Sequence, residues 1–545
     1  MTGRQWGWLA GVVVLVGLGL RLVLLDGQSL WYDEGVSAYM TPRTFAEIAT
    51  ATAVDIHPPL YYWLLSVWAV PFGQGEIALR SYSVLLGTAM VWCTWRLGRA
   101  LAGEAVGLAA AALMAVSPLA VQYSQEVRMY AQAGLLAAAS SWAGLALMAS
   151  SLDEAASSRR RLVLAVAYGL LAAMLLYTHY YGALVVAAQQ LWAGLLVLLT
   201  RRWRIVPFWA LGTALAGLLF LPWLPVALRQ TGYYPGLGTP QPAWALVLDT
   251  VNVLSIGLAT TRFGFRAGLA PFVGLAVLGA WSLGRPHPPT PSPPRWRGGV
   301  GAASSPPLHR NGEEAGGWGL LLLWLVVPIA GIVILSRSRP LYEPRFLMLV
   351  LPAWTILVGA GLVALGRAAG WLLGRGPGLP PLARQLVVIA SSVVMAGLLL
   401  IPSARSLASY YVDPVYARDD YRGLAQTVAL REEPGDAVVL TAPGQVEIFS
   451  YYFRGHADVF PLPLQRPLDP ADTRGRLEAL GATHQRVWLV LWAANEADPD
   501  EVILGWLEGQ GRRIGGQQFG RVELRLYDLN ATAMYPAPTE REVES

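Results

Sequence analysis

Residues 6–25 read WGWLAGVVVLVGLGLRLVLL, and the ten residues that follow, 26–35, read DGQSLWYDEG. The first stretch contains a single charge, Arg21, and has the length that an α-helix needs to cross the hydrocarbon core of a bilayer. It is long for a signal peptide and continues directly into an acidic loop, so we expect an uncleaved first span. The fold is therefore expected to begin with a membrane helix followed by a polar loop.

The composition extends this expectation to most of the chain. Of its 545 residues, 54% are hydrophobic and only 14% are charged, and the mean hydropathy is +0.44, whereas soluble proteins average about 25% charged residues. All basic residues other than histidine are arginine, and the net charge of +5 gives no reason to expect a nucleic-acid partner. Cys93 is the only cysteine, which excludes an intramolecular disulfide.

Arginine clusters predict which loops face the cytoplasm. By the positive-inside rule, residues 159–161 and 201–204 lie inside, and counting outward from them gives about 11 spans with the N-terminus inside and the C-terminus outside. The predicted spans are 6–25, 77–98, 104–122, 129–151, 162–181, 183–200, 206–228, 268–284, 318–336, 345–366 and 385–402. Residues 26–76 then form one long external loop. Within the external loops, 57–72 and 243–258 are apolar but too short to span, so we expect two interfacial helices there.

The chain is predicted to have two domains. Residues 1–402 form a polytopic membrane bundle, mostly α-helical, and 403–545 form a small external α/β domain with strands near 437–440, 486–491 and 523–527 and helices near 416–431 and 499–511. The tail contains no glycine-rich phosphate loop. Residues 285–317 are so rich in proline and glycine that we expect a disordered cytoplasmic insert without a catalytic role.

The acidic pair Asp33 and Glu34 is the sharpest local feature. Adjacent carboxylates repel each other, and near a low-dielectric surface one of them tends to act as a proton acceptor. Taken alone, the pair fits a solvated acidic loop better than a catalytic site. The predicted external face also carries His57, His179 and four arginines close to helix ends, where the positive-inside rule disfavours arginine: Arg80, Arg128, Arg339 and Arg345.

An anionic partner would explain this excess of external arginine. The alternatives are that each arginine is a snorkelling anchor and that each histidine caps a helix. The combination in order of segments 31–34, 57–60, 78–81, 126–130 and 345–346 resembles glycosyltransferase family 39, the group of GT-C enzymes that includes protein O-mannosyltransferases and aminoarabinose transferases. The resemblance covers the membrane part of the chain.

The resemblance implies a GT-C fold with two interfacial helices in the first external loop and another after the seventh span. It also implies inverting transfer of a sugar from a polyprenyl-phosphate carrier to a lipid, glycan or protein acceptor in a bacterial inner membrane. Because nucleotide sugars are made in the cytoplasm, an external site needs a lipid-linked donor. The chain departs from the family's eukaryotic members by its insert and by lacking their β-trefoil domain.

On this basis we expect Asp33 to be the general base on the acceptor hydroxyl, with Glu34 orienting Asp33 or the sugar. The donor phosphate is assigned to Arg128, Arg339 and Arg345, with Arg80 holding the first loop. Further substrate contacts are expected from Trp31, Tyr32, His57, Glu126, Tyr130, His179 and Tyr342. The sequence gives no metal-ligand set, although it leaves a divalent cation beside the acidic pair open. Two other functions also stay open, a transporter or flippase of a lipid-linked glycan and a non-catalytic assembly partner.

Overall fold

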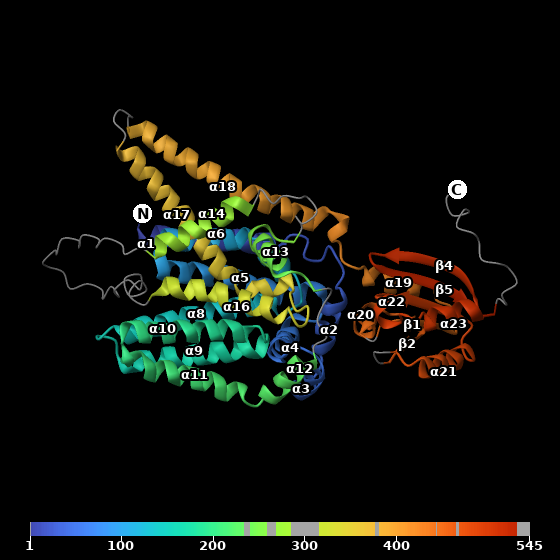
Figure 1. Ribbon diagram of the computed structural model, residues 1–545. Coiled ribbons are helices and arrows are strands. Elements are labelled where there is room, and N and C mark those ends of the chain that lie inside the picture. Colours follow the sequence, from blue (N-terminus) through green and yellow to red (C-terminus); the bar gives the residue numbers. More distant parts are fainter. Residues whose placement is uncertain are drawn as a thin grey trace. The chain divides into compact units, whose positions relative to one another are not determined.

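The computed structural model describes residues 2–233, 240–258, 269–284, 316–375, 381–442, 444–464 and 468–530 (Figure 1). The predicted insert at 285–317 lies outside these ranges except for its last two residues. The chain divides into two compact units: unit 1 comprises Met1–Leu25, Thr44–Trp68 and Arg80–Asp413, and unit 2 comprises Asp26–Arg43, Ala69–Leu79 and Pro414–Ser545. The units are divided differently from the predicted domains 1–402 and 403–545, because parts of the first polar loop, residues 26–76, pack with the C-terminal residues.

The membrane part is a bundle of helices that follow the predicted apolar segments closely. Their bounds are α1 Gly3–Leu22, α3 Phe45–Val54, α4 Leu60–Phe72, α5 Glu76–Ala102, α6 Glu104–Val116, α7 Pro118–Ser124, α8 Tyr130–Leu152, α9 Ser158–Thr178, α10 Gly182–Thr200, α11 Val206–Phe220, α12 Leu224–Tyr233, α13 Ala243–Ile256, α14 Ala270–Leu283, α16 Gly317–Leu335, α17 Leu351–Arg375 and α18 Pro381–Val412. The 3-10 turn η4 spans Pro344–Leu349, just before α17.

Among the described residues, eight helices are long and apolar enough to cross a membrane, or nine if α6 and α7 count as one span bent by 58°. The chain is therefore an integral membrane protein, and its predicted fold class is confirmed. The number is lower than the 11 spans expected. The predicted span 268–284 forms only the 14-residue helix α14, and the predicted span 385–402 lies inside α18, where the side chains of 381–393 are outside the described set.

Small residues let the helices approach closely. A Cβ on Gly279 of α14 would lie 2.0 Å from the backbone oxygen of Leu357 in α17, and a Cβ on Gly361 of α17 would lie 1.9 Å from the backbone oxygen of Leu275. Because apolar burial does not drive association between helices in lipid, such close backbone packing supplies the attraction instead. The α14–α17 contact is thus specified by two glycines on facing helices.

The bend between α6 and α7 has a clear cause in the sequence. Pro118 has no N–H to donate to the carbonyl of Met114, so α6 ends and a new helix begins, with the Ser117 hydroxyl accepting from the amide of Ala120. The fully buried Arg21 of α1 donates to the carbonyls of Met114 and Ala115 and to the hydroxyl of Ser124. Arg21, which lies inside a predicted span, therefore supplies the hydrogen-bond donor that the carbonyl of Met114 lacks because of Pro118.

The first polar loop contains three short helices, one more than the resemblance implied. They are α2 Tyr32–Met40, α3 and α4, and the last begins within the apolar segment predicted at 57–72. The segment predicted at 243–258 also forms a helix, α13. Both predicted helices are confirmed as helices, while their position in the plane of the membrane stays a prediction.

Unit 2 contains a five-stranded sheet in the order β2-β1-β3-β5-β4. The strands are β1 Asp436–Leu440, β2 Asp458–Pro461, β3 Arg486–Leu491, β4 Arg512–Phe519 and β5 Val522–Asp528. β1 pairs in parallel with β2 and β3, whereas β5 runs antiparallel to β3 and β4. The predicted α/β tail and its three strands are confirmed, and the edge strands β2 and β4 are additional.

Helices cover both faces of this sheet, since all five residues of β1 are buried. On one face, Ala437 and Val439 pack with α21 (Pro470–Gly481) and α23 (Val502–Gln510) in one apolar core. The remaining helices of the tail are α19 Tyr421–Arg431, α20 Gln445–Tyr452 and α22 Ala494–Ala497 (Figure 1). Helix α20 packs against α2 of the first loop, which is why residues 26–43 belong to this unit.

Candidate active site

Two of the predicted phosphate-binding arginines converge on one aromatic ring in unit 1. The guanidinium carbon of Arg128 lies 6.0 Å from the ring centre of Tyr130, and that of Arg345 lies 5.8 Å from it. Arg128 is contributed by the turn between α7 and α8, while Arg345 belongs to η4, which packs on α8. We call the set His57, Arg128, Tyr130, His179 and Arg345 the arginine cluster.

His57 links Arg128 to an acidic residue. The Nδ1 atom of His57 lies 3.0 Å from Oδ2 of Asp55, and its Nε2 atom lies 3.2 Å from Nη2 of Arg128. Because a guanidinium can only donate, Nε2 must accept and Nδ1 must carry the proton that it donates to Asp55. Burial acts to raise the pKa of Asp55, but hydrogen bonds from the His57 ring and from the backbone of Ile56, together with the positive charge of Arg128, outweigh it, and the net shift is downward.

The resulting order Asp55–His57–Arg128 fixes the orientation of the arginine. Arg128 is only 3% exposed, and a buried guanidinium that is held in place by such hydrogen bonds has little freedom to turn. The carboxylate keeps His57 in the tautomer that accepts from Arg128. The chain of contacts therefore presents a preformed cation rather than a mobile surface arginine.

His179 is a buried neutral member of the cluster. Burial depresses its pKa well below the usual value, and the positive charges of Arg345 and Arg128 act in the same direction. The backbone N–H of Tyr181 donates to Nδ1 of His179 at 3.2 Å, which occupies that nitrogen as an acceptor. The His179 ring stands edge-on to Phe346 at 4.9 Å between ring centres, so the histidine packs within the arginine cluster without adding charge.

The other predicted residues of unit 1 have contacts of their own. Arg80 is buried and donates to the backbone oxygen of Leu25 at 2.7 Å, Arg339 donates to the backbone oxygen of Gly232 at 2.7 Å, and the Tyr342 hydroxyl donates to Oδ2 of Asp249 at 2.8 Å. Glu126 is buried two residues before Arg128 and accepts from its amide through the backbone oxygen. Roles for these four side chains in binding substrate stay predictions.

The acidic pair belongs to unit 2, and its two members differ. Glu34 is completely buried, and its Oε2 atom accepts from Nη1 of Arg418 at 2.9 Å and from the backbone N–H of Trp31 at 3.3 Å. Asp33 is partly exposed at the start of α2, where its backbone oxygen accepts from the Ser37 hydroxyl at 3.2 Å. The carboxylate of Glu34 is thus committed to an ion pair inside the fold.

The aromatic residues before the pair are also fixed within unit 2. The ring of Tyr32 stacks on Trp492 with 4.6 Å between ring centres and 16° between ring planes. The indole nitrogen of Trp31 is buried and has no hydrogen-bond partner in the described parts of the chain. Their predicted contact with substrate stays a prediction.

Three residues that the sequence did not single out take part in these arrangements: Asp55, Asp249 and Arg418. The Asp-x-His spacing at 55–57 was a usable signal for Asp55, because a two-residue separation lets the carboxylate reach the ring of the histidine. Nothing local marks Asp249 or Arg418, whose partners lie far away in sequence. The residues that the structure describes include no group of three or more His, Cys, Asp or Glu side chains that could hold a metal ion, and the divalent cation stays an open prediction.

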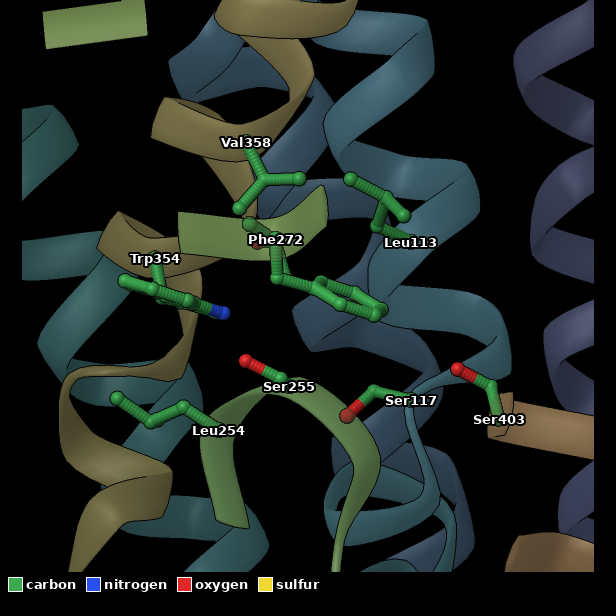
Figure 2. A pocket seen from close by; sticks show the side chains of 9 residues that line it. Leu113, Ser117, Leu254, Ser255, Phe272, Trp354, Val358 and Ser403 are labelled. Carbon is green, nitrogen blue, oxygen red and sulfur yellow. The ribbon is translucent and has the colours of Figure 1, made fainter. Parts of the chain in front are cut away.

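A small cavity lies elsewhere in unit 1, between α6, α13, α14, α17 and α18 (Figure 2). Figure 2 shows the hydroxyl of Ser255 and the indole nitrogen of Trp354 facing this space, and neither has a protein hydrogen-bond partner among the described residues. The free volume is about 10 Å³, roughly what one water molecule needs. The cavity is therefore too small for a sugar or a phosphate.

Comparisons with known proteins place this geometry in context. Residues 56–225 match the family described as "Dolichyl-phosphate-mannose-protein mannosyltransferase", and this range includes His57, Arg128, Tyr130 and His179. No curated protein matches the chain.

Two solved structures share the fold. ArnT from Cupriavidus metallidurans bound to undecaprenyl phosphate has a TM-score of 0.60 at 16% identity, with 98% of this chain and 100% of that chain covered. The oligosaccharyltransferase AglB from Archaeoglobus fulgidus, in complex with an inhibitory peptide and a dolichol-phosphate, has a TM-score of 0.59 at 12% identity, with 93% of this chain and 73% of that chain covered.

These findings confirm the GT-C fold and the resemblance to glycosyltransferase family 39 that the sequence predicted. They support the predicted enzyme class, a polyprenyl-phosphate-dependent glycosyltransferase, and give no support to the transporter alternative.

Proposed function

We propose that this chain transfers a sugar from a polyprenyl-phosphate carrier to an acceptor hydroxyl, with inversion at the anomeric carbon, on the extracytoplasmic side of a bacterial inner membrane. The observation that carries the proposal is the convergence of Arg128 and Arg345 on Tyr130, with Arg128 oriented by the Asp55–His57 pair.

Two guanidinium groups gather around the ring of Tyr130, and Glu343, 3.5 Å from Nε of Arg345, offsets part of their charge. An anion beside them would relieve the repulsion that is left. Arginine suits a phosphate in particular, because its planar fork can donate two parallel hydrogen bonds to phosphate oxygens. The related folds support this choice of ligand, since the ArnT structure contains undecaprenyl phosphate and the AglB structure contains a dolichol-phosphate. The arginine cluster is accordingly our candidate site for the phosphate of the donor.

In the proposed reaction, the oxygen of the acceptor hydroxyl attacks the anomeric carbon of the sugar from the face opposite the phosphate. The bond from that carbon to the phosphate oxygen breaks, and the departing polyprenyl phosphate gains a negative charge that the arginines stabilise in a water-poor setting. The proton of the acceptor passes to the carboxylate of Asp33. Glu34, which was predicted to orient Asp33 or the sugar, supports Asp33 through the local fold.

Transfer can be tested with the purified full-length chain, a radiolabelled polyprenyl-phosphate sugar and a membrane-lipid extract as the acceptor source. We expect labelled product and an equal amount of released polyprenyl phosphate. Neither is expected when the protein is heat-inactivated or left out. Movement of the labelled donor across a vesicle membrane without any covalent transfer would favour the transporter alternative.

The sidedness of the site rests on the arginine distribution. In a background without Cys93, an impermeant thiol reagent added to intact spheroplasts is expected to label Val54→Cys, which replaces an 86% exposed side chain, and to spare Arg160→Cys. Labelling of Arg160→Cys alone would reverse the proposed orientation.

A further inference from the structure

The segment that carries Asp33 is fastened at many points to the C-terminal residues of unit 2. We propose that Arg418 and Glu34 are positioning residues, a buried ion pair through which the C-terminal α/β domain, residues 414–530, fixes the start of α2 and with it the carboxylate of Asp33. The proposal rests on the proposed role of Asp33 as the base, and it assigns the C-terminal domain a part in the transfer step.

The ion pair itself is the first observation. Glu34 is fully buried, and Arg418 is 12% exposed at its side chain, with 2.9 Å between Nη1 and Oε2. The same Oε2 atom accepts from the amide of Trp31, so one carboxylate oxygen joins the first turn of α2 to Arg418. Because Glu34 is fully buried, the low dielectric around its carboxylate strengthens this interaction, and the pair holds the helix start in one orientation.

Backbone contacts on the N-terminal side of Asp33 support the same conclusion. The amide of Arg418 donates to the side-chain oxygen of Gln28 at 2.8 Å, and the hydroxyl of Ser29 donates to the backbone oxygen of Asp419 at 2.9 Å. The amide of Leu30 donates to the hydroxyl of Tyr452 at 2.7 Å. Residues 28–30 are thus bound to the C-terminal domain through consecutive positions.

Close packing fixes the other side. A Cβ on Gly35 would lie 2.4 Å from the Cβ of Ile448 in α20, so only glycine allows α2 to pack this closely on that helix. The Tyr32 ring stacks on Trp492, and the Tyr32 hydroxyl lies where a Cβ on Gly444 would be. Asp33 therefore sits between two residues, Tyr32 and Glu34, that both contact the C-terminal domain.

The chemistry explains why Glu34 is not a second base. A carboxylate that accepts from an arginine and from an amide is stabilised in its charged form, and its buried oxygens offer no route for a proton from an acceptor hydroxyl. Placing a general base, by contrast, demands tight geometry, because misplacement by about 1 Å can cost on the order of 100-fold in rate. In this arrangement Glu34 holds the start of α2 in place, and its neighbour Asp33 accepts the proton.

The test compares variants of the full-length membrane protein in the transfer assay. Arg418→Gln is expected to lower kcat by about 10- to 100-fold while the KM for the donor changes by less than about 3-fold, and Arg418→Lys is expected to recover part of the loss. The double variant Glu34→Gln/Arg418→Gln is expected to be no worse than Arg418→Gln alone, because the two residues act as one unit. The matched control is Arg525→Gln, which breaks an arginine–glutamate pair with Glu523 in the same domain and is expected to leave kcat unchanged.

A readout that does not depend on activity is hydrogen exchange of the amides of residues 28–35. Arg418→Gln is expected to accelerate this exchange, while Arg525→Gln is not. If Arg418→Gln does not fold, Tyr452→Phe removes the acceptor of the Leu30 amide and is expected to produce the same two changes in weaker form. A wild-type kcat together with unchanged exchange in the folded variant would overturn the proposal.

Failure of the proposed function gives a different pattern. If Asp33→Asn transfers sugar at the wild-type rate, the base assignment is wrong, and Asp33 no longer needs positioning. If Asp33→Asn is inactive and Arg418→Gln is fully active, the base stands and the positioning role is wrong.

Discussion

The two halves of the first polar loop use acidic residues in opposite ways. In residues 26–43, Glu34 is buried against Arg418, and the neighbouring Asp33 stays partly exposed. In residues 44–68, Asp55 binds His57, which in turn binds Arg128. In the first half an arginine fixes a carboxylate, and in the second half a carboxylate fixes an arginine through a histidine. Charged pairs in this loop therefore orient side chains. The side chains they orient, Asp33 in the first half and Arg128 in the second, are the candidates for catalysis and for phosphate binding.

The largest effect is expected from Asp33. Replacing it in Asp33→Asn keeps the shape of the side chain but removes the proton acceptor, so kcat is expected to fall by roughly 10²- to 10⁴-fold with the donor KM largely unchanged. The control is Asp26→Asn, which neutralises a carboxylate in the same loop and is expected to transfer normally. Steady-state kinetics with labelled donor measure kcat and KM for both variants. Equal activity of Asp33→Asn and Asp26→Asn would contradict the assignment of Asp33 as the base.

The next largest effect is expected from the arginines of the cluster. Arg128→Gln and Arg345→Gln each remove charged hydrogen bonds to the donor phosphate in both the bound and the transition state, so kcat should fall and KM should rise, with a loss of about 100-fold in kcat/KM. Arg229→Gln serves as the control, because Arg229 donates to the backbone oxygen of Ala53 outside the cluster. An unchanged KM in both cluster variants would argue that the phosphate binds elsewhere.

A smaller effect is expected from Asp55. In Asp55→Asn the charge that holds the Nδ1–H form of His57 is lost, and Arg128 loses its fixed orientation. The loss of one charged hydrogen bond corresponds to roughly a tenfold rise in donor KM. Kinetics of Asp55→Asn in the Arg128→Gln background test the connection: the two effects are expected not to add, whereas independent effects would show that Asp55 acts by another route.

Much of the membrane fold could be predicted because apolar length determines helices almost by itself. α8, α9, α10 and α16 lie within a few residues of the predicted spans, since each is bounded by polar residues. The bend at Pro118 and the short helix α14 were harder to predict. A long apolar segment is compatible with a straight span, a bent span or a helix that ends before it has crossed the bilayer. The count of spans was therefore less predictable than the class of fold.

The candidate site shows the same limit. Arg128 and Arg345 stood out because arginine is unusual at those positions, and the structure brings both to Tyr130. Arg418 did not stand out, because an arginine in a polar tail is ordinary until its partner is known. Glu34 was expected to orient Asp33 or the sugar because it is adjacent to Asp33, but adjacency does not reveal that its partner is Arg418, which lies far away in sequence.

The smallest effect concerns the pH dependence of folding stability that His179 contributes. It tells whether His179 is a buried neutral histidine or a charged ligand. Its pKa is well below the usual value in the native protein, so below about pH 6.5 the unfolded chain takes up a proton at this residue that the folded chain does not. Stability therefore falls as the pH is lowered through this range, and the contribution at pH 5.5 is about 1 kcal/mol. Asp55 has a pKa lowered from 3.8 and so titrates below this window.

In His179→Gln this contribution is absent. Thermal denaturation of the full-length protein in detergent at pH 7.5 and 5.5 is expected to show a smaller drop in Tm for His179→Gln than for the wild type. If both proteins lose the same stability on acidification, His179 takes up a proton as readily in the folded state as in the unfolded state, and at pH 5.5 it adds a third positive charge beside Arg128 and Arg345. In that case the amide of Tyr181 could not donate to Nδ1, and the arginine cluster would have to bind its phosphate with a charge that varies with pH.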